Sequence, residues 1–284
     1  PVRIVAIDEA SLAKLGQWPW SRTIIADILR KLTEQGAAVV VFDILFSEPD
    51  RTSPEETIKA LPKEQAAMLA PLIANEPTHD EVLAKAVAES PTVLALALSQ
   101  RPNPPVVKAG FAIAGDDPKA FVPAFPGATS NIKILDDAAA GIGAINWIPD
   151  RDQVVRRVQL VYRVGDQYVP SLLTEALRVA QQAGTYVLKG SNASGETAFG
   201  QDTGLNHIRV GAIEIPTDAD GGIWLKFRAA NPSAYIPAWK VLSGTDNPYV
   251  IAGRIILVGS SAPGLMDLRA SPLEKMSAMK LQNS

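Results

Sequence analysis

The sequence contains no cysteine in its 284 residues. A disulfide framework and a thiolate metal site are therefore excluded. The absence leaves the compartment open, because many periplasmic proteins also lack cysteine. Long hydrophobic runs are missing too, since the longest candidate, AAVVVFDILF at 37–46, is interrupted by Asp43 and has the length of a strand. It is far shorter than the ~20 apolar residues that a bilayer-spanning helix needs.

Runs of basic residues and groups of histidines are also lacking. The 27 Lys and Arg residues are scattered and are outnumbered by 30 Asp and Glu residues, which gives a formal net charge of −3. A nucleic-acid partner is therefore not expected. The two histidines, His79 and His207, are far apart in the sequence and lack the spacing of zinc ligands. We expect His79 to cap a helix or to be solvated.

The apolar residues that are present follow patterns typical of a globular α/β protein, at 47% hydrophobic and 20% charged residues. VRIVAID at 2–8 predicts a strand, and apolar residues at helical spacing from Ile24 to Leu32 predict a helix. The unbroken run at 37–46 predicts a second strand that is covered on both faces. These elements form a right-handed βαβ unit, and a third strand is predicted at 92–98.

The second half of the chain shows strand patterns separated by turn residues. Strands are predicted at 143–150 and 154–164, and a hairpin is predicted from 207–216 and 222–228 around the turn TDADGG. A final buried strand is predicted at 254–259. The sequence thus predicts one domain, residues 1–284, with an α/β fold and a mixed sheet: N-terminal parallel βαβ units, then antiparallel hairpins and a final buried strand.

Two long insertions interrupt these patterns. Residues 47–90 predict a helical excursion, in which SPEE at 53–56 and THDE at 78–81 have the form of capping boxes. Residues 101–127 contain six prolines and predict a long surface loop. Further along, Ser171 is expected to start an amphipathic helix.

Acidic residues follow several of the predicted strands, at Asp8, Asp43 and Asp267. In open α/β sheets the carboxyl ends of the strands form the ligand crevice, and carboxylate oxygens suit Mg²⁺ or Ca²⁺. These three acids are therefore candidate ligands of a divalent cation. The alternative, which we favour, is that they are structural and cap loops or pair with Arg22 or Arg269.

The loop GSSAPG after the last strand suggests two kinds of active site, and neither fits. A phosphate-binding P-loop would need Lys followed by Ser or Thr after the second glycine. A nucleophile elbow would need a second glycine where Pro263 stands, and a hydrolase of that fold needs a histidine after the nucleophile. No histidine follows Ser260 or Ser261. A catalytic serine is therefore not expected.

The stretch GQWPWSR at 16–22 places two tryptophans in the loop before a predicted helix. One interpretation is that they cover the ends of the sheet, with an indole N–H bonded to a carbonyl and with Arg22 paired to Asp8 or Asp43. The other is that they form a stacking wall for a ligand, with Arg22 as an anion receptor. The candidate ligand-binding crevice comprises Asp8, Glu9, Trp18, Trp20, Arg22, Asp43, Ser260, Ser261, Asp267 and Arg269.

Four stretches, taken in order, resemble the type-2 CHASE family of sensory extracellular domains associated with cyclases and histidine kinases. They are VRIVAIDEASLAKLGQWPWSR, GAAVVVFDILFSEPD, GAINWIPDRDQVVRRVQL and GRIILVGSSAPGLMDLRASP. The resemblance covers residues 2 to 273. It implies a non-enzymatic sensor on the extracytoplasmic side of a bacterial plasma membrane, held by flanking transmembrane segments. It also implies an unknown small-molecule or environmental signal, no catalytic residues and no required cofactor.

The same resemblance implies a cytoplasmic effector, with an adenylate or guanylate cyclase first and a histidine or Ser/Thr kinase as the alternative. Because a two-fold interface is an economical bistable element, we expect the full receptor to be a homodimer. Two other hypotheses stay open: a ligand-free dimerisation scaffold, and a divalent-metal α/β enzyme.

The sequence departs from the family pattern at two places. A turn that reads Asp-x-Asp-Gly in the family has Gln153 after Asp152 here, so this turn is expected to be reshaped. The final LEKMSAMKLQNS matches little of the family, which suggests a truncated or vector-derived C-terminus. Because the chain opens at Pro1 without methionine or leader, we expect a fragment of a longer protein.

Overall fold

The computed structural model describes residues 2–193, 203–228, 231–262, 268–273 and 275–277. A seven-stranded sheet forms the centre, with strand order β15-β1-β16-β2-β3-β6 and with β7 beside β3. These strands are β1 Val2–Ile7, β2 Val39–Phe42, β3 Thr92–Ser99, β6 Gly127–Thr129, β7 Gly141–Ala144, β15 Tyr235–Pro237 and β16 Ile255–Ser260. All neighbouring pairs are parallel except β3 and β6.

The last predicted strand, β16, lies between β1 and β2. Leu257 is in register with Ile4 on one side and with Val41 on the other. The predicted βαβ unit is therefore present, but its two strands are separated by a strand from the far end of the chain. The predicted strand at 37–46 is shorter than expected, because β2 ends at Phe42.

Helices cover both faces of this sheet, which explains its unbroken apolar strands. On one face lie α1 Glu9–Leu15, α2 Arg22–Glu34, α5 His79–Ala88, α6 Lys133–Ala138 and α8 Ala238–Ser243. Val5 and Ile7 of β1 point to that side, whereas Ile4 and Ala6 point to the other and pack with α7 Leu172–Ala180. Alternate residues of one strand thus belong to two separate cores.

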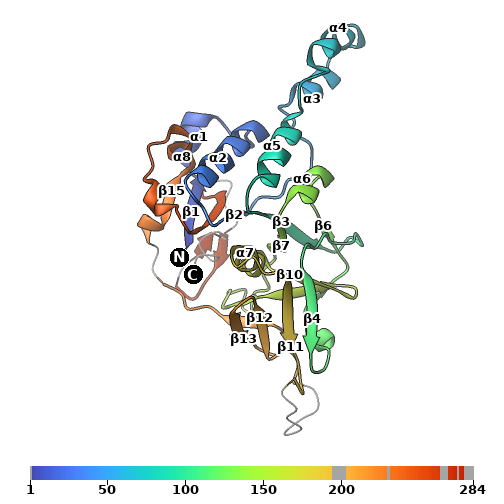
Figure 1. Cartoon of the computed structure of the whole chain (residues 1–284), viewed down its shortest axis with the longest axis vertical. Coiled ribbons are helices and arrows are strands. Elements are labelled where there is room, and N and C mark those ends of the chain that lie inside the picture. Colours follow the sequence, from blue (N-terminus) through green and yellow to red (C-terminus); the bar gives the residue numbers. More distant parts are fainter. Residues whose placement is uncertain (1, 194–202, 229–230, 263–267, 274, 278–284) are drawn as a thin grey trace.

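A second layer of smaller sheets lies beyond helix α7 (Figure 1). Tyr162, Val164 and Val169 of this layer also pack in the core cluster that contains α2 and α5. One of these sheets has the order β13-β12-β11-β4, a second has β10-β9-β5, and the pairs β14-β8 and β17-β18 complete them. Their strands are β4 Gly110–Ala114, β5 Ala124–Phe125, β8 Arg157–Gln159, β9 Val161–Val164, β10 Gln167–Pro170, β11 Thr185–Lys189, β12 His207–Val210, β13 Ile213–Pro216, β14 Gly222–Trp224, β17 Leu268–Ala270 and β18 Lys275–Ser277. Short 3-10 turns occur at Pro118–Ala120, Pro232–Ala234 and Pro248–Val250. The α/β class with mixed sheets is confirmed.

Two predictions about this second layer were wrong. The hairpin joins β12 to β13 around Gly211, whose φ is 55°, while β14 pairs with β8 instead of β13. The proline-rich segment 101–127 is not only a surface loop, because β4 adds a parallel edge strand to β11. Both predictions failed because β14 and β4 pair with strands far away in the sequence. Local turn residues do not reveal such pairing.

The helix-capping predictions had mixed outcomes. Thr23 and Ser21 were both candidates to cap α2, and the structure selects Ser21. Ser171 caps α7 as expected, and Thr78 with Glu81 forms the predicted capping box of α5. The box at Ser53 is wrong, because its hydroxyl bonds the Glu55 carboxylate, 2.6 Å away, and does not cap the backbone.

Part of the predicted excursion 47–90 is an arm that projects from the body (Figure 1). It consists of α3 Pro54–Lys59 and α4 Lys63–Ile73, and neither helix contains a buried residue. The arm leaves the body after Ser53 and returns at Thr78, the cap of α5. The other part of the excursion, α5, is an ordinary core helix that packs on α2.

The turn at 150–154 keeps a backbone that suits glycine although it carries glutamine. Gln153 has a φ of 63°, in the left-handed region. Asp150 and Val154 close the turn through a backbone hydrogen bond of 3.0 Å. Gln153 therefore adopts the conformation that a glycine favours.

Gln153→Gly should raise the free energy of unfolding by about 0.5–1 kcal/mol, because a side chain in the left-handed region costs roughly 1–2 kcal/mol and the entropy of glycine offsets part of that gain. Urea denaturation would measure the change. Arg151→Gly is the matched control, since the φ of Arg151 is outside this region, and it should lower stability. A Gln153→Gly variant less stable than the parent would contradict the argument.

Candidate functional site

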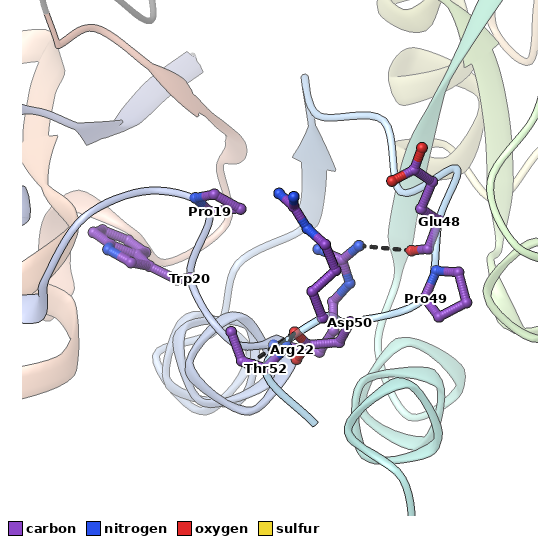
Figure 2. Close-up of a pocket in the computed structure, with 8 residues that line it drawn as sticks. Pro19, Trp20, Arg22, Glu48, Pro49, Asp50 and Thr52 are labelled. Atoms are coloured by element: carbon purple, nitrogen blue, oxygen red, sulfur yellow. Dashed lines mark hydrogen bonds between the residues drawn. The ribbon is translucent and has the colours of Figure 1, made fainter. Parts of the chain in front are cut away.

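A polar pocket lies where two loops at the carboxyl ends of the strands meet. Helix α2 runs antiparallel to β1 and β2, so its first residue, Arg22, lies near the ends of both strands. The loop after β2 passes the same point and forms the opposite wall. A hollow of about 370 Å³ results, and it is lined by Pro19, Trp20, Arg22, Glu48, Pro49, Asp50, Arg51 and Thr52. Figure 2 shows Arg22 in the middle, between Trp20 and Glu48.

Trp20 is part of the core. Its exposed fraction is 3%, and its indole N–H donates to the carbonyl of Gly16 at 2.8 Å. Trp18 is half-buried and meets Trp20 edge-on, with ring centres 5.7 Å apart. The interpretation of a buried tryptophan whose indole N–H is bonded to a carbonyl is thus confirmed for Trp20, which also lines the pocket.

Asp50 is the centre of a buried hydrogen-bond network. It is 4% exposed, and it accepts from the backbone N–H of Arg22 at 2.7 Å and from the N–H and hydroxyl of Thr52 at 2.9 and 2.8 Å. Ser21 Oγ and His79 Nδ1 lie 3.2 and 3.0 Å from the same carboxylate. Burial raises the pKa of Asp50, but these hydrogen bonds outweigh it and leave the pKa below its ordinary value.

The Arg22 side chain pairs with a residue that the sequence analysis did not select. Its Nε lies 3.4 Å from Asp80 Oδ1, its Nη2 donates to the carbonyl of Glu48 at 3.1 Å, and its guanidinium lies 4.5 Å from the ring centre of Phe46. The expected pairing with Asp8 or Asp43 was wrong. Burial lowers the pKa of Arg22 against the attraction of Asp80 and Asp50, and burial also raises the pKa of Asp80.

Ser21, His79 and Asp50 bring a serine, a histidine and an aspartate together, but not in a catalytic arrangement. A triad needs the serine on one ring nitrogen and the aspartate on the other. Here Ser21 Oγ and Asp50 Oδ2 both lie 3.0 Å from Nδ1 of His79. The hydroxyl therefore cannot be activated by a ring that Asp50 orients, and the three residues form a structural network.

This network closes the base of the arm. Asp50 precedes the arm, and His79 and Asp80 follow it at the start of α5. The backbone N–H of Asp50 donates directly to Asp80 Oδ2 at 3.1 Å. Ser21 and Arg22, at the start of α2, contact Asp50 before the arm and His79 and Asp80 after it. We call these five residues the base clamp. One wall of the pocket is thus continuous with the chain that enters α3.

A second anchor fixes the other end of the loop after β2. The N–H of Phe46 donates to Asn131 Oδ1 at 2.8 Å, and Asn131 Nδ2 donates to the carbonyl of Ala95 at 2.9 Å and to Asp136 Oδ1 at 2.8 Å. A shallow hollow of about 530 Å³ lies beside it. Burial raises the pKa of Asp136. This anchor positions Phe46 under the Arg22 guanidinium.

Most of the other predicted crevice residues meet at the sheet edge but lie outside the pocket. Asp8 caps α1 by accepting from Ser11 N–H at 2.8 Å, and Glu9 is exposed in the first turn. Asp43 follows β2, and its N–H donates to the carbonyl of Val258 at 2.9 Å. Ser260 is in register with Ile7. The pocket lining is therefore drawn from two loops, and not from the strand ends themselves.

The end of β16 and the candidate metal ligands complete this edge. Ser261 N–H donates to the carbonyl of Ile7 at 3.1 Å, and the buried hydroxyl of Ser260 has no hydrogen-bond partner among the described residues. Asp267 lies outside the described residues, as does the side chain of Arg269. Within the described part of the chain, no three His, Asp or Glu side chains are grouped as a metal site would need.

Glu48, Asp50 and Asp80 are the residues that sequence reasoning missed. A usable signal was present, because SEPD at 47–50 follows the predicted strand 37–46 directly and ends in Asp50. Asp80 lies inside a capping box, and local capping chemistry was taken as its full explanation. Only the packing of α5 on α2 brings it to Arg22.

The fold and the site together define a class: an α/β domain with mixed sheets and a polar pocket at the carboxyl ends of its strands. The family model described as CHASE2 domain matches residues 1–284, and the chain belongs to this family. CHASE2 domains are sensory extracellular domains of signalling receptors and are not catalytic. Neither a search of curated proteins nor a search of solved structures found a match. Across the described residues, no helix has the length and apolar character of a membrane span.

Proposed function

We propose that this chain is the extracytoplasmic sensor of a bacterial transmembrane receptor that relays a stimulus to a cytoplasmic effector. Its membership of the CHASE2 family supports the sensory role. The proposed effector is an adenylate or guanylate cyclase, with a histidine or Ser/Thr kinase as the alternative. Transmembrane segments on either side of the chain would hold it at the membrane surface, and the receptor would act as a homodimer.

The proposed stimulus is a small polar molecule that binds between Arg22 and Glu48. The pocket presents charges of both signs, from Arg22 and Arg51 and from Glu48 and Asp50, which suits a neutral or zwitterionic ligand more than a strong anion. No cofactor is needed for this binding. The observation that carries the proposal is that Arg22 lines the pocket and also holds the base clamp.

Binding would then be relayed through the arm. A ligand that draws Arg22 toward the pocket competes with Asp80 and Asp50 for its charge, so it would change how firmly the two ends of the arm are held. A stimulus can shift a two-state element only by its differential affinity for the two states. The base clamp offers such an element, because it connects a pocket wall to both ends of α3 and α4.

Arg51→Cys gives a direct test, because the chain has no other cysteine and Arg51 is exposed at the pocket. A membrane-impermeant maleimide added to intact cells should label Arg51→Cys and fill the pocket. Effector output, measured as cyclic nucleotide or as phosphorylation, should change about fivefold or more, as typical coupling energies give.

Lys85→Cys is the matched control for this test, since Lys85 is exposed on α5 and lies outside the pocket. It should be labelled equally without a change in output. Labelling that requires permeabilised cells would refute the extracytoplasmic location. Full labelling of Arg51→Cys with unchanged output would favour a ligand-free scaffold.

A further inference from the structure

Helix α4 exposes an apolar surface that the other residues described by the structure leave uncovered. Residues 65–75 carry no charge, no residue of α4 is buried, and Met68 and Leu72 are 77% and 74% exposed. Ala66 and Ile73 are partly covered on the side that faces α3. Exposed apolar patches of this kind mark interaction sites, and a helix without a polar face normally has a partner.

The exposed side of α4 has the spacing of a helix-pairing seam. Glu64, Met68 and Pro71 of α4 recur at intervals of four and three residues, as in positions that alternate along a coiled-coil contact. Asn75, in the turn that follows the helix, continues this spacing four residues further on. Leu72 and Ala67 flank this line, one on each edge. Such a seam fits another helix laid along it.

We propose that α4 pairs antiparallel with α4 of a second copy of this chain. This inference rests on the homodimer of the proposed function and identifies its contact surface. A two-fold axis between Leu69 and Ala70 sets Met68 of one copy against Leu72 of the other, because an isologous contact pairs each residue reciprocally. The small residues Ala67 and Pro71 allow close approach on the opposite edge.

The polar groups at the two ends of α4 favour an antiparallel over a parallel arrangement of two copies. The antiparallel register places the Glu64 carboxylate of one copy opposite the Asn75 amide of the other, so that an acceptor meets a donor. A parallel register would place Glu64 opposite Glu64, which is unfavourable. Antiparallel helices also set the N-terminus of one beside the C-terminus of the other, which suits their dipoles.

The size of the seam fits a switchable contact. Helix α4 has 11 residues and is therefore about 16 Å long, and one face of it offers less than the roughly 800 Å² per partner of a standard interface. The isolated chain should therefore be monomeric or weakly dimeric. Tethering two chains to one membrane raises their effective concentration, so the full receptor should pair through α4.

Cysteine crosslinking of the full receptor in membranes tests the register. Glu64→Cys alone and Asn75→Cys alone should not form disulfide-linked dimers, because positions 64 lie about 16 Å apart across the axis, beyond the ~7 Å limit for Cα atoms, and positions 75 likewise. Co-expressing Glu64→Cys and Asn75→Cys receptors should give crosslinked heterodimers at least tenfold above either alone. Lys85→Cys, exposed on α5, paired with Asn75→Cys should give none.

Any other crosslinking result would contradict the antiparallel α4 contact. Self-crosslinking of Glu64→Cys would show a parallel pair, and no crosslink in the mixture, or a crosslink to a different protein, would show that a second copy does not cover α4. An amine-reactive crosslinker on the parent receptor separates the two proposals. A parent dimer without the expected disulfide overturns the α4 contact only, whereas a monomeric, signalling parent overturns the homodimer itself.

Discussion

Replacing Trp20 with alanine is expected to lower the free energy of unfolding by about 3–5 kcal/mol. The indole is 3% exposed and packs in the largest core cluster, beside Trp18. Its removal leaves a cavity in this cluster and leaves the carbonyl of Gly16 without its 2.8 Å donor. Chemical denaturation of the parent and the variant would measure the loss.

Trp224→Ala provides the matched control, because this tryptophan is 64% exposed on β14. Its replacement should change the free energy of unfolding by less than about 0.5 kcal/mol. If Trp20→Ala unfolded at the parent midpoint, Trp20 would not be a core residue. A stacking role at the pocket would then be the better explanation.

Asp50→Ala is expected to destabilise the protein by roughly 3–5 kcal/mol, as when one partner of a buried charged network is lost. The buried N–H groups of Arg22 and Thr52 would lose their acceptor, and Arg22 would keep Asp80 as its nearby carboxylate. Asp27→Ala is the control, since the Asp27 side chain is 59% exposed and its pair with Arg30 lies on the surface of α2. Its cost should stay below about 1 kcal/mol.

The same network predicts a pH dependence with a definite sign. The pKa of Asp50 is lowered in the folded protein, so its ionised form stabilises the fold above its unfolded pKa of about 3.9. That stabilisation is lost as the pH falls through the folded pKa. Asp80, with a raised pKa, acts in the opposite direction, so the comparison must isolate Asp50.

Asp50→Asn isolates this contribution, because it keeps an acceptor oxygen and removes the titrating group. Between about pH 4 and pH 2 the parent should lose stability more steeply than Asp50→Asn, as measured by denaturation at each pH. Parallel pH profiles for the two proteins would mean that the hydrogen bonds from Arg22 and Thr52 do not favour the ionised carboxylate.

The arm and the pocket belong to one connected system. The base clamp joins the chain before α3 to the chain after α4 through Ser21 and Arg22 at the start of α2, and Arg22 also lines the pocket. Ligand binding at one end and subunit pairing at the other would therefore act on the same few bonds. Stability losses in Asp50 variants should for this reason coincide with changes in α4 crosslinking.

Local patterns in the sequence determined the elements and several of their ends. The unbroken run in β2, the helical spacing in α2 and the caps at Ser21, Thr78 and Ser171 are set by neighbouring residues, which is why they could be predicted. The absence of cysteine excluded a thiolate metal site. Local patterns also carried the resemblance to the CHASE2 family, which the match over residues 1–284 confirmed.

The tertiary structure alone decided which elements are neighbours and which charges meet. It placed β16 between β1 and β2, paired β14 with β8, and brought Asp80 of α5 to Arg22 of α2. Each of these contacts joins residues far apart in the chain. The apolar pattern of a strand indicates that the strand is buried, but it does not indicate which element packs against it. A buried arginine needs a carboxylate partner, and the sequence offers several candidates for Arg22. Only the packing of the helices on the sheet shows that the partner is Asp80.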